Sequence, residues 1–198
     1  RSLTDSAVFS PAKLERVYRI ACLDNALAMV VEPVLAAMAE IAPGAGTAIR
    51  THDEGMLAAL RSGELDFGIF PAVNLPSDFE STTLLETSYV QIVRAGHPLE
   101  ALAGRPEALE ALKDFRRIQI VVHPDTDPTA GGMPGPAKIP LSAGETILWT
   151  ESWLGAVTLL ERSDFVLAVP WRTAARLGRS MALTAVAPIP DAPPLRPA

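Results

Sequence analysis

Cysteine occurs once among the 198 residues, at Cys22, which excludes an intrachain disulfide and a thiolate metal cluster. No apolar run reaches the roughly eighteen residues that a membrane-spanning helix needs. The chain does not begin with the charged and then apolar stretch of a signal peptide. Together these features favour a cytoplasmic protein that makes no contact with a membrane.

Positive charge is also scarce: 17 Lys and Arg stand against 23 Asp and Glu, which gives a formal net charge of −6. Binding to the phosphates of nucleic acid needs clustered Lys and Arg, so we do not expect this chain to hold nucleic acid by itself. The GxSxG, HExxH, GxxxxGK[ST] and GxGxxG signatures are all absent. Their absence weighs against the commonest hydrolases and nucleotide-dependent enzymes.

The stretch from Val17 to Pro43 is the strongest structural signal in the chain. Val17 to Cys22 is rich in β-forming residues and predicts a strand. The next residues predict an amphipathic helix, because apolar side chains recur at spacings of three and four. Asp24 or Asn25 can cap this helix, and Pro33 predicts either a bend or two separate helical pieces.

The pattern of strand and helix continues to residue 70. Residues 47–51 predict a second strand, Asp53 can cap a helix over 56–60 that Gly63 stops, and residues 65–70 predict a third strand. Three strands joined by two helices within so short a stretch require a parallel, right-handed βαβαβ unit.

The second half repeats the alternation after two β-rich pieces in residues 83–94. Strands are predicted at 117–123, 145–150, 165–169 and 181–189, and helices at 106–112, 152–160 and 170–178. Ser152 can cap its helix, and Trp153 lies on that helix's apolar stripe, which favours the core. Residues 124–140 carry too many prolines and glycines for regular structure and predict a long loop. The last residues, 190–198, have no predicted partner of their own.

Ligands bind at the carboxyl edge of parallel sheets, so residues that follow strands are the candidate site. These residues are Leu23, Asp24, Asn25, His52, Asp53, Phe70, His97, His123, Thr150, Ser152 and Trp171. Asp24, Asp53 and Ser152 also suit plain N-capping, and each histidine also suits a surface loop, so both roles stay open.

A metal site is an alternative use of the few cysteine and histidine side chains. Cys22, His52, His97 and His123 are the residues available, at intervals of 30, 45 and 26. These intervals match no local zinc pattern, so we expect no metal and no cofactor.

Several short motifs occur in one order along most of the chain. They are Phe9-x-Pro11, Arg19-Ile20-Ala21, Pro33-x-Leu35, Pro43, Leu60-x-x-Gly63-Glu64-Leu65-Asp66-x-Gly68-Ile69, Val93-Arg94-x-Gly96-His97-Pro98-Leu99 and Val166-x-x-Val169-Pro170. This succession, from about residue 9 to 190, resembles the effector-binding domain of LysR-type transcriptional regulators. The similarity is greatest to the branch that responds to small aromatic compounds and flavonoids.

The resemblance implies an α/β protein with two Rossmann-like lobes joined by two crossover strands, the type-two periplasmic binding protein fold. Residues 1–15 would end a linker, 16–86 with 187–198 would form lobe I, and 87–186 would form lobe II. The crossover strands would lie near residues 86–94 and 183–188. The family's winged helix-turn-helix, which precedes the lead-in, is not in these residues, so DNA would be contacted only through that domain.

The resemblance also implies a small effector in the interlobe cleft, a homodimer or homotetramer, and no enzymatic activity. Its pocket positions fall on Leu23 to Asn25, Asp53, Phe70, His97, His123, Pro124 and Trp171. Asp24 and Asp53 would repel a carboxylate unless a nearby histidine is protonated, which favours a neutral or phenolic aromatic effector.

Two alternatives stay open at this level. A transport binding protein of the same fold would need an export signal and a membrane receptor. An acid–base or metal-dependent enzyme would use the cleft histidines.

Overall fold

The computed structural model describes residues 9–70, 75–121, 144–189 and 196–197. The chain divides into two compact units, residues 1–69 and 70–198. The lobe boundaries predicted from the sequence stay a prediction, and the compact units differ from them in grouping residues 70–86 and 187–198 with the second unit. The predicted site residues His123 and Pro124, and the predicted loop at 124–140, lie outside the described residues.

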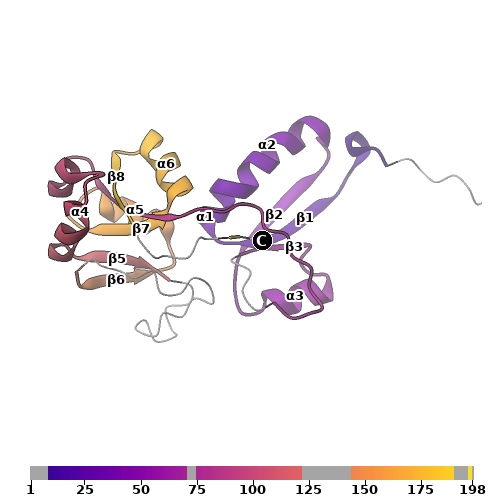
Figure 1. Cartoon of the computed structure of the whole chain (residues 1–198). Helices are drawn as coiled ribbons and strands as arrows, with labels where there is room; N and C mark the ends of the chain where they lie inside the picture. Colours follow the sequence, from indigo (N-terminus) through magenta and orange to yellow (C-terminus); the bar gives the residue numbers. More distant parts are fainter. Residues whose placement is uncertain (1–8, 71–74, 122–143, 190–195, 198) are drawn as a thin grey trace, which may run out of the picture. The chain divides into compact units, whose positions relative to one another are not determined.

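The first unit is built on a three-stranded sheet in the order β2-β1-β3 (Figure 1). Its strands are β1 (Val17–Cys22), β2 (Gly46–Thr51) and β3 (Phe67–Ile69), and both neighbours pair with β1 in parallel. The predicted βαβαβ unit is therefore confirmed. β3 is shorter than the predicted 65–70, because the Leu65 N–H is still bonded to the Ala59 carbonyl of the preceding helix turn.

One helical stretch links β1 to β2, and it changes its winding just before Pro33. It consists of α1 (Asp24–Ala26), the π-helical turn η2 (Leu27–Val31) and α2 (Glu32–Ile41). Pro33 lies in the first turn of α2, directly after the wider π turn. A π turn re-registers the backbone hydrogen bonds, so the missing proline N–H is tolerated without breaking the helix.

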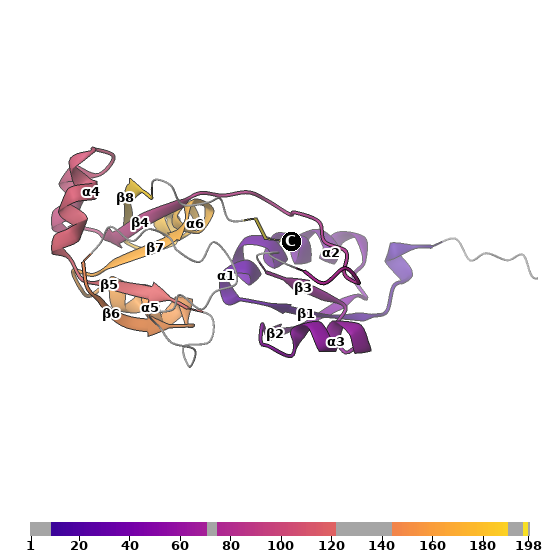
Figure 2. The ribbon, with the colours of Figure 1, turned by 60° about the horizontal axis from the view of Figure 1, so that its bottom comes forward.

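Two helices cover opposite faces of the first sheet. Cys22 and Ile69 form a core with Val31 on the side of α2. On the other face, a Cβ added at Gly68 would lie 2.9 Å from Met56 Sδ of α3 (Met56–Ser62). Figures 1 and 2 show α2 and α3 on either side of the strands. Gly68 therefore lets α3 approach the sheet closely, and Gly63, at φ +74°, ends that helix.

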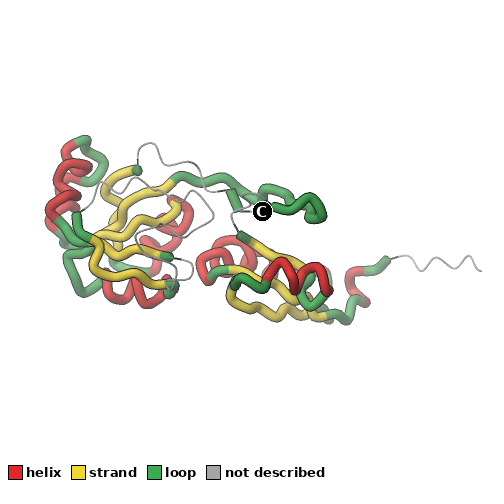
Figure 3. The backbone as a smooth tube through the Cα atoms, turned by 90° about the horizontal axis from the view of Figure 1, so that it is seen from below, coloured by secondary structure: helices red, strands yellow, loops and turns green. Residues whose placement is uncertain are grey.

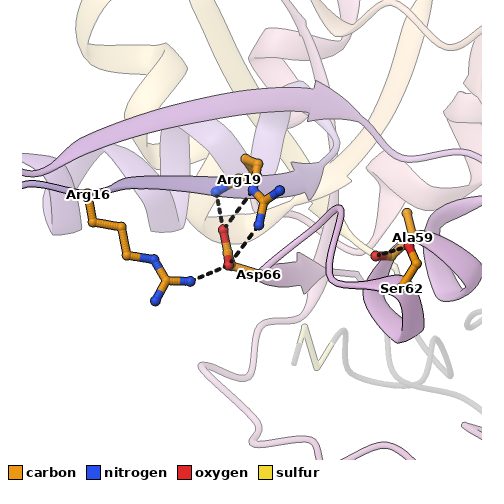
Figure 4. Close-up of polar contacts among 5 residues, drawn as sticks. All are labelled: Arg16, Arg19, Ala59, Ser62 and Asp66. Atoms are coloured by element: carbon orange, nitrogen blue, oxygen red, sulfur yellow. Dashed lines mark hydrogen bonds and ion pairs between the residues drawn. The ribbon is translucent and has the colours of Figure 1, made fainter.

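Asp66 ties the start of β1 to the segment that enters β3 (Figure 4). Its carboxylate accepts from the Arg19 backbone N–H at 2.8 Å, from Arg19 Nε at 3.2 Å and from Arg16 Nη2 at 2.5 Å. The Arg16 guanidinium also lies 4.9 Å from the centre of the Tyr18 ring. The hydrogen bonds from Arg19, followed by that from Arg16, hold the pKa of Asp66 well below its usual range.

We predict that Asp66→Asn lowers the stability of the chain. A carboxyl whose pKa is lowered by folding stabilises the native state above its unfolded pKa of about 4, and this stabilisation is lost as the pH falls below that value. The midpoint of urea denaturation should therefore be lower for the variant than for the wild type at neutral pH. As the pH falls into the acid range, the midpoint of the variant should decrease less than that of the wild type. Equal midpoints at neutral pH would contradict this role of Asp66.

The second unit has a five-stranded sheet in the order β6-β5-β7-β4-β8. The strands are β4 (Tyr89–Arg94), β5 (Arg117–Ile120), β6 (Thr146–Thr150), β7 (Val166–Pro170) and β8 (Leu183–Pro188). β5 pairs in parallel with β6 and β7, whereas β4 is antiparallel to β7 and β8. Figure 3 shows the strands of each unit together with their helices.

Helices pack on both faces of this second sheet. The remaining helices among the described residues are η1 (Pro11–Lys13) in the first unit and, in the second, η3 (Pro98–Leu102), α4 (Glu107–Ala111), η4 (Leu112–Asp114), α5 (Trp153–Leu160) and α6 (Trp171–Ser180). Buried residues of α5 and α6 form one cluster with Val90 and Ile118, against which Trp153 packs as predicted. Leu99 and Leu112 form a second cluster with Val93. No helix in the described part of the chain is long and apolar enough to cross a membrane.

The end of the chain corrects the expectation that it has no partner. Arg196 Nε donates to Glu86 at 2.8 Å, and the Pro197 carbonyl accepts from the Leu84 N–H at 2.9 Å. The tail thus pairs with the segment that leads into β4. Hydropathy patterns gave no sign of this, because the contact needs only one ion pair and one backbone hydrogen bond.

Candidate functional site

The parallel register brings three predicted site segments to one edge of the first sheet. Cys22, the last residue of β1, lies opposite both Thr51 and Ile69, which are the last residues of β2 and β3. The residues that follow these strand ends are Leu23, Asp24, Asn25, His52, Asp53 and Phe70. We call this group the first-sheet edge. It is the carboxyl edge at which parallel sheets bind ligands.

The helix that begins at the first-sheet edge lacks a side-chain cap. Its N-cap residue is Leu23, which cannot accept a hydrogen bond through its side chain, while Asp24 and Asn25 lie inside the first turn. The prediction that Asp24 or Asn25 caps the helix is therefore wrong. Backbone N–H groups of this first turn have no partner within the helix, and the helix dipole makes their surroundings favourable for an acceptor.

Asp53 does not cap a helix either, because α3 begins three residues later with Gly55 as its N-cap. Its carboxylate instead accepts from Arg50 Nη2, at 3.0 Å to each oxygen. The Asp53 side chain is 51% exposed and that of Arg50 is 40% exposed. Sequence reasoning missed Arg50, although its spacing of three residues from Asp53 was a usable signal for an ion pair.

Cys22 lies at the same edge but cannot serve as a nucleophile. It is buried, and burial raises the pKa of its thiol, with a smaller effect from the charge of Asp24. Among the described residues, no three His, Cys, Asp or Glu side chains lie close enough together to hold a metal ion. His123, the fourth residue of the metal alternative, lies outside the described residues.

The second sheet has a comparable edge where β5, β6 and β7 end. Ile120 pairs with Thr150, so Val121 and Glu151 follow neighbouring strand ends. Ser152 caps α5 as predicted, with its Oγ accepting from the Gly155 N–H at 3.0 Å. Trp171 opens α6 directly after β7 and is 49% exposed. An exposed tryptophan at a strand end is available for contact with a ligand.

His97 does not share this edge, although it also follows a strand. Its strand, β4, is antiparallel to β7, so the end of β4 lies at the opposite edge of the sheet from Trp171. The side chain is 2% exposed, its Nδ1 accepts from the Leu99 N–H at 3.0 Å, and its ring lies 4.6 Å from that of Phe115. The expectation that His97 lines the pocket is corrected: it caps η3 within the core.

We predict that His97 makes folding sensitive to mild acid. Burial lowers its pKa and outweighs the opposite effect of nearby Asp164. As the pH falls below about 6.5 the unfolded chain takes up this proton first, so the free energy of unfolding decreases. His97→Asn keeps an acceptor for the Leu99 N–H and should reduce this decrease. The test is to measure Tm of the wild type and of His97→Asn between about pH 7.5 and 5.5. An equal dependence of Tm on pH in the two proteins would contradict the prediction.

Both units are α/β, and their parallel strands end beside polar and aromatic residues. The chain belongs to the LysR substrate binding domain family, whose pattern matches residues 12–197. It is thus an effector-binding domain of the LysR-type transcriptional regulators. The family predicted from the sequence motifs is confirmed.

Solved structures give the same fold. The probable transcriptional regulator PA0477 from Pseudomonas aeruginosa is 22% identical with a TM-score of 0.75, over 96% of this chain and 61% of that one. The regulatory domain of MexT, a transcriptional activator in Pseudomonas aeruginosa, is 20% identical with a TM-score of 0.68, over 94% and 88%. The BenM effector binding domain with its effector benzoate is 18% identical with a TM-score of 0.62, over 93% and 82%.

At these identities the similarity establishes the fold alone. The predicted α/β class and type-two periplasmic binding protein fold are confirmed. The chain spans 61% of the length of PA0477, and the relatives are described as regulators of transcription.

Proposed function

We propose that this domain binds a small aromatic effector at the first-sheet edge and passes that event to transcription through the association of regulator copies. The observation that carries the proposal is the shared register of Cys22, Thr51 and Ile69, because six of the predicted site residues directly follow these strand ends. Family membership supports the same use of this edge.

The chemistry of the edge suits a ring with one or two polar groups. Phe70 supplies an aromatic side chain, and the first turn of α1 supplies backbone N–H donors near Leu23. Benzoate bound to BenM supports an effector of this size.

A thermal-shift screen tests the proposal with benzoates, phenols, flavonoids and divalent metals. A ligand at a hundred times its Kd should stabilise the domain by about 2.7 kcal/mol, a readily measured increase in Tm. Phe70→Ala should weaken an aromatic hit about threefold to tenfold through loss of ring contact. Phe9→Ala, which removes a 72% exposed ring from the lead-in, is the matched control.

The screen also separates the proposal from its alternatives. No aromatic hit together with a clear stabilisation by a metal would contradict the effector proposal and favour the histidine site. An aromatic hit that Phe70→Ala and Phe9→Ala weaken equally would contradict the assignment of the site to the first-sheet edge.

We also propose that copies of the domain associate through α2. None of its residues is buried, although most are apolar, and Val34 and Ile41 are 50% and 60% exposed. An exposed apolar helix face of this kind commonly marks a protein interface. A symmetric homodimer is the commonest outcome of such a self-complementary surface, and dimers can pair further into tetramers.

We predict that Val34→Glu shifts the purified domain from dimer toward monomer, because it places a charge in the apolar contact. Light scattering coupled to size-exclusion chromatography measures this directly. Leu84→Glu is the control, since Leu84 is 49% exposed but lies outside α2. A wild-type domain that stays monomeric at high concentration would contradict the proposal.

A further inference from the structure

Helix α6 presents a row of arginines to solvent. Arg172, Arg176 and Arg179 follow one another at spacings of four and three, which places them on one face of the helix, and all three residues are exposed. The buried residues of this helix are Thr173 and Ala174, and Ala174 belongs to the apolar cluster on the second sheet. The three arginines, which we call the arginine stripe, therefore lie on the solvent side of α6.

No acidic residue nearby in the fold compensates the charge of the arginine stripe. The sequence from 165 to 190 contains neither Asp nor Glu. α6 packs against β4, β7 and β8, and none of these strands carries an acidic side chain. Within the described part of the chain Arg172 and Arg179 form no ion pair, and Arg179 Nε donates to the Ala175 carbonyl of its own helix at 3.2 Å. Arg176 takes part in another interaction, so Arg172 and Arg179 are the two charges without a counter-ion.

The stability of α6 gains nothing from the charge of Arg172. This residue lies in the first turn of the helix, where the helix dipole favours negative charge. Arg176 follows four residues later and Arg179 three residues after that, and like charges at these spacings repel each other weakly. Only Arg179, in the last turn, has a favourable position relative to the dipole. The fold does not use the charge of Arg172, which remains available to a partner.

The spacing of the arginine stripe suits another helix. Arg172 and Arg179 are seven residues apart, which separates them by about 10.5 Å along the axis of α6. A helix with carboxylates at the same spacings of four and three presents them at the same intervals. Guanidinium groups bind carboxylates through parallel N–H bonds. The stripe therefore matches an acidic helix both in charge and in spacing.

Nucleic acid is a poorer match for this surface. The whole chain has a formal net charge of −6. Duplex DNA carries one charge per about 1.7 Å of its axis, so a duplex that extends past the stripe also meets the acidic residues of the chain. A short acidic segment is affected chiefly by the stripe, because exposed charges more than about 8 Å away are screened at physiological salt.

We propose that the arginine stripe of α6 is a docking surface for an acidic helical segment of another protein. Carboxylates of that segment pair with Arg172 and Arg179, the two charges that have no counter-ion in the described part of the chain. The proposal uses neither the first-sheet edge nor α2, so it holds or fails independently of the effector and of self-association.

Three fluorescent helical peptides of equal length are the probes. The first carries three Glu at spacings of four and three on one face, the second carries the same three Glu spread around the helix, and the third has Gln in place of each Glu of the first. Fluorescence anisotropy measures their Kd for the whole chain at about 50 mM and about 150 mM salt, because a contact between charges weakens as the salt concentration rises.

Two double variants of the chain are compared with the wild type. Arg172→Gln with Arg179→Gln removes two charges from the arginine stripe. Lys13→Gln with Arg105→Gln removes the same charge from two exposed residues in η1 and in the turn before α4, which makes it the matched control. Both substitutions replace exposed side chains, so unchanged Tm values should show that each variant is folded.

The one-face peptide should bind the wild type at least fivefold more tightly than the spread peptide, at about the strength of a few exposed ion pairs. The peptide with Gln should show no saturable binding. Loss of Arg172 and Arg179 should weaken the one-face peptide about fivefold to tenfold, whereas the control variant should stay within about twofold of the wild type. The higher salt concentration should weaken the one-face peptide and reduce the difference between the variants.

Four results would overturn the proposal: no saturable binding of the one-face peptide to the wild type, equal binding of the one-face and spread peptides, an unchanged Kd after loss of Arg172 and Arg179, or the same weakening in the control variant. A duplex DNA of random sequence is the fourth probe. If it binds the wild type more tightly than the one-face peptide and loses affinity with Arg172 and Arg179, the stripe belongs to nucleic acid and the acidic segment is excluded.

Discussion

The pairing of β1 with both of its neighbours is the constraint on which the first unit depends. Because β2 and β3 run parallel to β1, each connection has to cross a face of the sheet, and the two faces are covered by α2 and α3. The same arrangement forces all three strands to end at one edge. The residues of the predicted site that follow these strands are therefore brought to one edge by strand direction alone.

The helical stretch after β1 couples this edge to the surface that we assign to self-association. α1 begins at the edge and α2 continues to Ile41 without a break, with the π turn at Leu27–Val31 absorbing Pro33. A ligand at the N-terminal end and a partner along α2 would therefore contact one continuous rod. Single π turns inside α-helices are frequent at functional sites, and this one lies between the edge and α2.

Sequence patterns predicted the local elements of both units well, because hydrophobic periodicity and capping residues act over short distances. The strand Val17–Cys22 and the Ser152 cap are examples. His97 was misplaced because a residue's edge depends on whether its strand runs parallel or antiparallel to its neighbours, which local patterns do not carry. Asp53 was misread because an acidic residue before a helix suits both a cap and an ion pair, and only the geometry of Arg50 decides between them.

Two aspartates of the first unit show how the same chemistry leads to different roles. Asp66 has an 11% exposed side chain and accepts from two arginines and a backbone N–H, so its charge is fixed and belongs to the fold. Asp53 is 51% exposed and is held by one nitrogen of Arg50. Water and other ions can replace such a partner with little loss of stability. Among these two arginine-paired carboxylates, the number of donors and the exposure of the side chain thus separate a group that holds the fold together from a surface pair that contributes little to stability.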